Sequence, residues 1–137
     1  MASLNTTERN TVKNSSKKKC KKCGKRKGKS QFNSKQANCK SCCKKSVKER
    51  IKRARQFIYD YLLSHPCVDC SETNPIVLEF DHIKNTKIGQ VGQMAKYNPS
   101  IKALAAEIEK CEVRCANCHR IKTAKNNGSW IYNVHCQ

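Results

Sequence analysis

The spacing of apolar residues predicts two elements in the first half of the chain. Residues 1–19 carry almost nothing to bury, so we expect a disordered basic arm there. Over residues 44–64, apolar side chains recur every three or four positions with no Gly or Pro between them, and Pro66 follows. This pattern predicts an amphipathic helix within a basic segment, 44–66. For residues 1–19, the composition leaves open whether the arm contacts a partner or is a solvated tail.

The second half is more apolar and predicts short elements of both kinds, an α+β unit. Residues 76–80 read as a short β-strand, and the polar stretch 85–93, with two glycines, as a loop or the return of a hairpin. Helical spacing recurs over 101–110, and a final helix is expected over 119–127, where a glycine follows. Residues 129–137 are expected to form a C-terminal tail.

Charge is distributed as unevenly as hydrophobicity. Of the net charge of +19, residues 1–66 hold 20 Lys/Arg and 3 Asp/Glu, which gives +17, whereas residues 67–137 hold 9 and 7, which gives +2. No apolar run approaches the roughly 18 residues of a membrane span, and no amphipathic stretch carries bulky lipid anchors. We therefore expect a nucleic acid partner for the first half, and neither a membrane nor a small-molecule substrate.

Cysteine usage favours metal sites over disulfides. The chain has 11 cysteines, an odd number, mostly in Cys-x-x-Cys pairs, and no signal peptide is expected. This favours zinc in a reducing compartment, the cytoplasm or the nucleus. Cys20 and Cys23 are separated by 15 residues from Cys39 and Cys42, a spacing that can set four thiolates around one Zn²⁺. Cys43 competes for the fourth position, but only Cys42 preserves the two-residue spacing.

A second zinc site is expected from Cys67 and Cys70 together with Cys115 and Cys118; 44 residues separate the two pairs. We interpret this zinc as structural, because four thiolates leave no open position for water. His119 follows Cys118 directly, and its replacing Cys118 as the fourth ligand is the alternative.

The second zinc site leaves three side chains unassigned, and two of them suit a different metal. Asp81 and His119 offer the carboxylate and imidazole that a hard cation such as Mg²⁺ or Mn²⁺ accepts, so we expect them to hold one. His82 is the neighbour of Asp81 on an extended segment, so its side chain points elsewhere and is free to act as general base on a water molecule. A cation and an activated water are what phosphodiester hydrolysis needs.

Basic residues of the first half are the candidate nucleic-acid contacts, with an ordinary solvated surface as the alternative. They lie between the first two cysteine pairs and on the predicted helix: Lys25, Arg26, Lys27, Lys48, Lys52, Arg53 and Arg55. Phe32 is expected to form the small core of the first zinc unit.

In order and type, the motifs of residues 67–125 resemble the HNH endonuclease family, also called the ββα-metal nucleases. The matching motifs are Cys67-x-x-Cys70, Leu78-Glu-Phe-Asp-His-Ile83, Glu107-Ile-Glu-Lys-Cys111 and Cys115-Ala-Asn-Cys-His-Arg-Ile-Lys-Thr123. The four-cysteine unit over 20–43 resembles the small zinc ribbon found ahead of such nucleases.

The resemblance implies a zinc-stabilised ββα-metal module over 67–128, a hairpin followed by a helix with the metal between them. It implies a divalent cation on Asp81 and His119, His82 as general base, and cleavage of double-stranded DNA that leaves a 5′-phosphate. Arg120 and Lys122 would then contact the phosphate near the metal.

One position departs from the family pattern. The middle Asn of the motif is missing from residues 110–114, and Asn117 is the candidate substitute. The alternative function is a non-catalytic, zinc-dependent nucleic-acid-binding protein. The compact architecture resembles that of proteins encoded by viruses or mobile elements, an analogy at the level of architecture alone.

Overall fold

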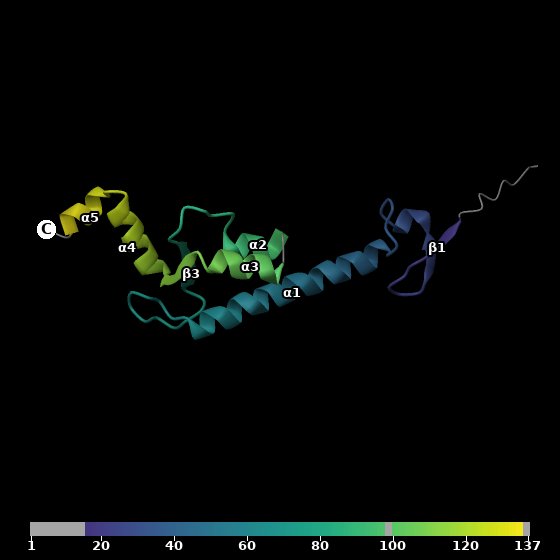
Figure 1. Ribbon diagram of the computed structural model, residues 1–137, viewed down its shortest axis with the longest axis horizontal. Helices are drawn as coiled ribbons and strands as arrows, with labels where there is room; N and C mark the ends of the chain where they lie inside the picture. The colour runs from purple at the N-terminus through teal and green to yellow at the C-terminus, as the bar shows by residue number, and fades with distance from the viewer. Residues whose placement is uncertain (1–15, 98–99, 136–137) are drawn as a thin grey trace, which may run out of the picture. The chain divides into compact units, whose positions relative to one another are not determined.

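A computed structural model describes residues 16–97 and 100–135; most of the expected basic arm and Cys136 lie outside this range. The chain divides into two compact units, Met1–Ser46 and Val47–Gln137. The described residues form two β-hairpins and five α-helices, an α+β architecture (Figure 1). Among these residues, no helix combines the length and apolar character that a membrane span needs.

The first unit is a hairpin, a 3₁₀ turn and the start of a helix. β1 (Lys17–Lys19) pairs antiparallel with β2 (Arg26–Gly28), so the end of the expected arm is an ordered strand. Gly24 has φ +70° at the turn between them, a conformation that glycine adopts without strain. The 3₁₀ turn η1 (Lys29–Gln31) leads to Phe32, which is 7% exposed and packs against Cys20 and Cys39. The small core predicted around Phe32 is confirmed.

α1 (Lys40–Ser64) confirms the predicted helix but begins four residues earlier, so that Cys42 lies in its first turn. The backbone N–H of Cys43 donates to the carbonyl of Cys39, which places the start of the helix at the second cysteine pair. Beyond Val47, α1 belongs to the second unit, where Ala54 and Leu62 are buried. The segment expected as a basic linker therefore contributes to the core of that unit.

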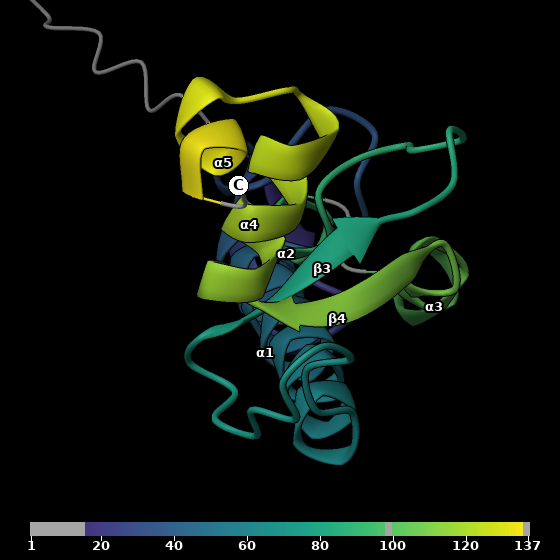
Figure 2. The same cartoon turned by 90° about the vertical axis from the view of Figure 1, so that its left-hand side faces the viewer.

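The second unit is built on one hairpin. β3 (Leu78–His82) pairs antiparallel with β4 (Cys111–Cys115), in the register Leu78↔Cys115 to His82↔Cys111. α2 (Val91–Tyr97) and α3 (Ile101–Ile108) lie between the two strands in sequence; α4 (Ala116–Asn126) and α5 (Trp130–His135) follow them. Figure 2 shows β3 and β4 side by side, with α4 beginning where β4 ends.

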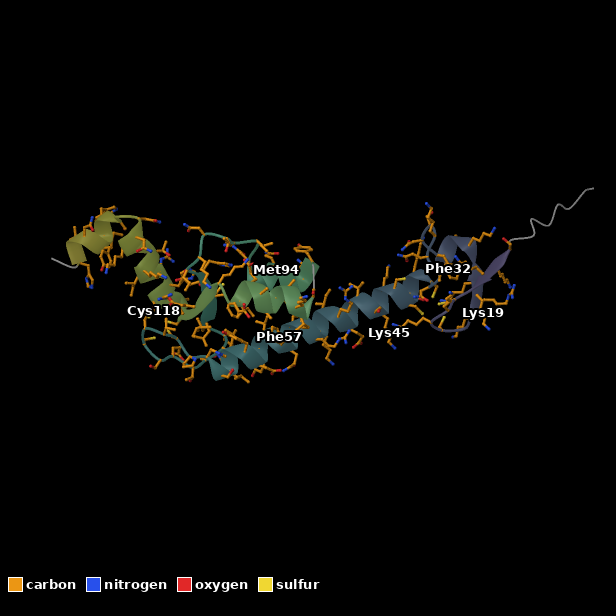
Figure 3. The ribbon with its side chains drawn as sticks, viewed as in Figure 1. Lys19, Phe32, Lys45, Phe57, Met94 and Cys118 are labelled. Atoms are coloured by element: carbon orange, nitrogen blue, oxygen red, sulfur yellow. The ribbon has the colours of Figure 1, made fainter. Side chains whose placement is uncertain are left out.

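Two apolar clusters hold this unit together. One joins Ala54 of α1 to α2 and α3, with Phe57 and Met94 packed against it (Figure 3). The other joins Leu62 to the hairpin through Leu78 and Val113 and includes two cysteines, Cys67 and Cys115. Because the clusters share Phe80 of β3, the hairpin is fixed between α1 and the helices α2 and α3.

The structure corrects several boundaries predicted from sequence. The strand expected at 76–80 is two residues later, because Asn74 accepts backbone bonds in a turn that leaves Ile76 88% exposed. Asp81 and His82 therefore lie within the strand rather than after it.

Helices replace two segments that were expected to be irregular. The predicted loop 85–93 ends in the first turn of α2, and the predicted C-terminal tail contains α5. The last predicted helix begins at Ala116, since the Cys115 sulfur caps it by accepting from the Cys118 N–H.

Candidate metal centres and active site

The first cysteine group is Cys20, Cys23, Cys39 and Cys42, whose sulfur atoms all lie within 4.8 Å of one another. Four sulfurs at about 2.3 Å from one tetrahedral ion lie about 3.8 Å apart. The Cys23 and Cys39 sulfurs are 4.0 Å apart, so the group could hold one zinc ion. The sulfur of Cys43 instead donates to the Gln36 amide oxygen, and the geometry selects Cys42 over Cys43 as the fourth ligand.

Hydrogen bonds in the first group favour the thiolate form of Cys39. The Ser41 hydroxyl, followed by the Cys42 backbone N–H, lowers the pKa of Cys39 to about 5. The Lys27 ammonium lies 3.4 Å from the same sulfur and 3.0 Å from the Ser41 hydroxyl. Lys27, expected at the nucleic acid, is therefore directed toward the metal group.

The second group is Cys67, Cys70, Cys115 and Cys118, again with all sulfurs within 4.8 Å. The Cys70 and Cys115 sulfurs are 3.7 Å apart, close to the tetrahedral separation. Burial works against ionisation of Cys67, but backbone N–H groups, first that of Cys115, outweigh it and lower its pKa to about 6. The group could hold one zinc ion with Cys118, and not His119, as its fourth ligand.

His119 is engaged by two carboxylates of β3. Its Nδ1–H donates to Oε2 of Glu79 at 2.7 Å, and its Nε2 lies 3.5 Å from Oδ1 of Asp81. Glu79 and Asp81 share one face of the strand because successive side chains of a strand alternate. The carboxylate of Glu79 thus fixes the ring so that Nε2 faces Asp81.

Asp81 is 9% exposed and is held by two cations through its other oxygen. Oδ2 accepts from Arg114 at 2.8 Å and from Lys122 at 2.6 Å. Burial opposes the ionisation of Asp81, but Lys122 and the other nearby cations lower its pKa below its usual value. Asp81 is therefore an anion, and its Oδ1 is the oxygen on the side of His119.

Arg114 connects this carboxylate to the second cysteine group. Its guanidinium is also 2.7 Å from Asp69, which lies between Cys67 and Cys70, and 2.6 Å from Glu112. The ion pairs therefore tie the Cys67–Cys70 turn directly to Asp81.

His82 points to the opposite face of β3, as predicted. Its Nε2 lies 2.9 Å from Oε1 of Glu107 on α3. Glu107 is fully buried, and its pKa lies well below its usual value: burial opposes this, but Lys110, backbone N–H groups and His82 outweigh burial.

The three residues predicted to carry chemistry border the same pocket. Asp81, His82 and His119 line an open pocket of about 530 Å³, together with Glu79, Lys87 and Gln90 among others. The pocket lies beside the second cysteine group because His119 follows Cys118 directly.

Other predicted site residues lie outside this pocket. Lys48, Lys52, Arg53 and Arg55 are exposed on α1, as are Lys25 and Arg26 in the first unit. Lys122 is ion-paired to Asp81, and Arg120 is exposed on α4. Asn117, the candidate substitute for the middle Asn of the motif, lines a different depression between α4 and α5.

Sequence reasoning missed Glu79 and Glu107, the carboxylates that hold the two histidines. The signal for Glu107 was present: it interrupts the apolar face of α3 between Leu104 and Ile108, where a charge is costly without a partner. The signal for Glu79 was weaker. It lies two residues before Asp81, so the two side chains share one face of the strand.

Comparison of the chain with protein-family models, curated proteins and solved structures gives no match. The resemblance to HNH nucleases therefore rests on the motif residues themselves.

Proposed function

We propose that this protein is a metal-dependent endonuclease of the HNH type that hydrolyses phosphodiester bonds in DNA. The observation that carries the proposal is the pocket in which Asp81, His82 and His119 meet, beside a four-cysteine group. A structural zinc site next to a carboxylate and two oriented histidines is more than a binding module needs.

Asp81 Oδ1 and His119 Nε2 fit a hard divalent cation. They are 3.5 Å apart, within the roughly 4.2 Å that two bonds of about 2.1 Å can span. Glu79 supports this by holding the Nδ1–H of His119, the arrangement that commonly orients a histidine ligand. Mg²⁺ or Mn²⁺ bound there would polarise the scissile phosphate.

His82 supplies the base. It removes a proton from water as the water oxygen bonds to phosphorus, and the bond from phosphorus to the 3′ oxygen breaks. The 3′ oxygen takes a proton from solvent, which leaves a 5′-phosphate on the other strand end. General bases of this kind contribute about 10²–10⁴ in rate.

The basic half supports docking. Lys48, Lys52, Arg53 and Arg55 lie exposed on α1, and the first 66 residues carry +17. Contacts of this kind follow the phosphate backbone without reading its sequence.

The second candidate is a nucleic-acid-binding protein without activity. The observation that favours it is the pairing of Asp81 with both Arg114 and Lys122, which neutralises the carboxylate, together with the missing middle Asn.

A plasmid assay separates the two. Wild-type protein carrying its zinc is expected to nick supercoiled plasmid only after Mg²⁺ or Mn²⁺ is added, and to leave ends that ligase reseals. Binding to the plasmid without cleavage, with several divalent cations and both DNA and RNA substrates, would favour the second candidate.

A further inference from the structure

Glu107 is a buried carboxylate whose contacts exceed what packing requires. It is 0% exposed, and its Oε1 accepts from the backbone N–H of Ile88 at 2.9 Å and of Gly89 at 3.3 Å. The same oxygen lies 2.9 Å from His82 Nε2, while Oε2 accepts from Lys110 at 2.8 Å. The hydrogen-bond partners of this carboxylate are thus two backbone N–H groups, an ammonium group and a ring nitrogen of His82.

The position itself would suit an apolar residue. Leu104 and Ile108 of the same helix are buried beside it in the core. Placing a carboxylate there is unfavourable unless its partners offset the lost hydration, and an apolar side chain of similar volume often stabilises such a site as well or better. The charge is therefore better explained by what it does for His82 and for the segment 88–89.

The first effect is on the ring of His82. A carboxylate only accepts hydrogen bonds, so the bond to Glu107 requires the hydrogen on Nε2 and leaves Nδ1 without one. His82 also lines the pocket. In the proposed reaction, Nδ1 would therefore be the ring nitrogen left to accept a proton from water.

The second effect is on the pocket wall. The backbone bonds from Ile88 and Gly89 fix the segment that carries Lys87 and Gln90, both of which line the pocket. The carboxylate of Glu107 thus contacts both His82 and the backbone of residues 88–89.

Cys111, which lies opposite His82 on β4, does not hold the His82 ring. Cys111 is the cross-strand partner of His82, and its thiol donates to the backbone carbonyl of Glu107. Cys111 belongs to the segment from which the middle Asn of the motif is missing.

We propose that Glu107 is the positioning residue of the active site, which holds His82 as the Nε2–H tautomer with Nδ1 as the proton acceptor, in place of the missing Asn. This inference rests on the proposed nuclease function. Glu107 touches no substrate and acts through His82.

The tautomer can be measured without any substrate. Long-range ¹H–¹⁵N NMR of the zinc-containing protein, assigned by comparison with His82→Ala, is expected to show Nε2 protonated and Nδ1 unprotonated. A protonated Nδ1 with a bare Nε2 would overturn the inference, whether or not the protein cuts DNA.

Kinetics of Glu107→Gln test the consequence. The amide preserves shape and an acceptor oxygen but removes the charge, so kcat is expected to fall at least about tenfold with KM within about threefold. Glu109→Gln makes the same charge change at an exposed residue two positions away and is expected to keep wild-type kcat.

The outcomes separate this inference from the function. A Glu107→Gln variant with two zinc ions and wild-type kcat would overturn the positioning role while the nuclease stands. A wild type that never cuts would refute the function, and the tautomer would still decide whether Glu107 orients His82.

Discussion

The two four-cysteine groups have nearly the same sulfur geometry but very different neighbours. In both, one sulfur pair is separated by about the tetrahedral distance, 4.0 Å in the first group and 3.7 Å in the second. In the first group, Phe32 packs against Cys20 and Cys39, and the Lys27 ammonium contacts the Cys39 sulfur. The second is backed by an apolar cluster and linked by Arg114 to carboxylates.

The difference indicates that what a four-cysteine group contributes depends on the residues that it positions. In the first unit it holds a short basic hairpin. In the second it fixes the start of α4, and hence His119, against the carboxylates of β3. Charge is also uneven between the two units: residues 1–46 hold 15 Lys/Arg and 1 Asp/Glu, which gives +14, whereas residues 47–137 hold 14 and 9, which gives +5.

The largest effect is expected from removing one zinc site at a time. Cys115→Ser should lower the zinc content from two ions to one and unfold the second unit, because structural zinc contributes about 10 kcal/mol or more. Cys39→Ser should also lose one zinc but leave the second unit folded. Zinc content and thermal unfolding followed by circular dichroism measure both.

Cys43→Ser and Cys111→Ser are the matched controls, since neither residue belongs to a four-cysteine group. Loss of zinc in either control would show that zinc binding is not confined to the two four-cysteine groups. Unfolding of the second unit in Cys39→Ser would show that the two groups do not stabilise their units separately.

The next effect concerns the orientation of His119. Glu79→Gln should weaken Mn²⁺ binding at the pocket by about 10–100-fold, the usual effect of removing the partner of a histidine ligand. Titration of the zinc-containing protein with Mn²⁺, followed by electron paramagnetic resonance, measures the affinity. Glu72→Gln, on the exposed turn after Cys70, is the control, and equal weakening in both variants would rule out a specific role for Glu79.

A smaller effect is expected at the basic face of α1. Changing Lys48, Lys52 and Arg55 to Gln should weaken DNA binding about tenfold near 0.1 M salt and reduce the slope of log K against log[salt] by about 0.9 for each lost contact. Changing Lys84, Lys96 and Lys102, which lie outside α1, to Gln removes equal charge and serves as the control. An equal loss of affinity in the two triple variants would mean that the charge asymmetry does not direct docking.

The smallest effect is expected where Arg114 links the second cysteine group to the pocket. Asp69 is 43% exposed, so Asp69→Asn should destabilise the protein by less than about 1 kcal/mol. The cleavage rate should fall only a few-fold, because Asp81 and Glu112 still hold the guanidinium. A loss as large as that in Glu79→Gln would show that the link controls Asp81 more strongly than its exposure suggests.

Local patterns predicted the cysteine groups and singled out Asp81, His82 and His119, because each of these signals lies within a few positions of the chain. The Cys-x-x-Cys pairs and the Asp81-His82 pair are of this kind. The helical spacing of α1 and α3 likewise reflects faces that are buried, at Ala54 and at Leu104.

What sequence reasoning could not supply depends on pairing between distant segments. β4 reads Cys-Glu-Val-Arg-Cys, with polar residues whose partners lie on β3 and near Cys67, so its alternation does not look like that of a half-buried strand. α2 was missed because Gly92 lies within it and Gly89 just before it. The partnership of Glu107 with His82 spans 25 residues and required the register of the hairpin.

The most direct test of the account is the single-turnover rate of plasmid nicking by His82→Ala in Mg²⁺. His135→Ala, a change at an exposed residue of α5 outside the pocket, is purified in the same way as the control. If His82 is the general base, His82→Ala loses about 10²–10⁴ in rate, with zinc content and DNA binding retained, while His135→Ala cuts like wild type. Equal cleavage by the two variants would contradict the account, because the activity would then not come from this pocket.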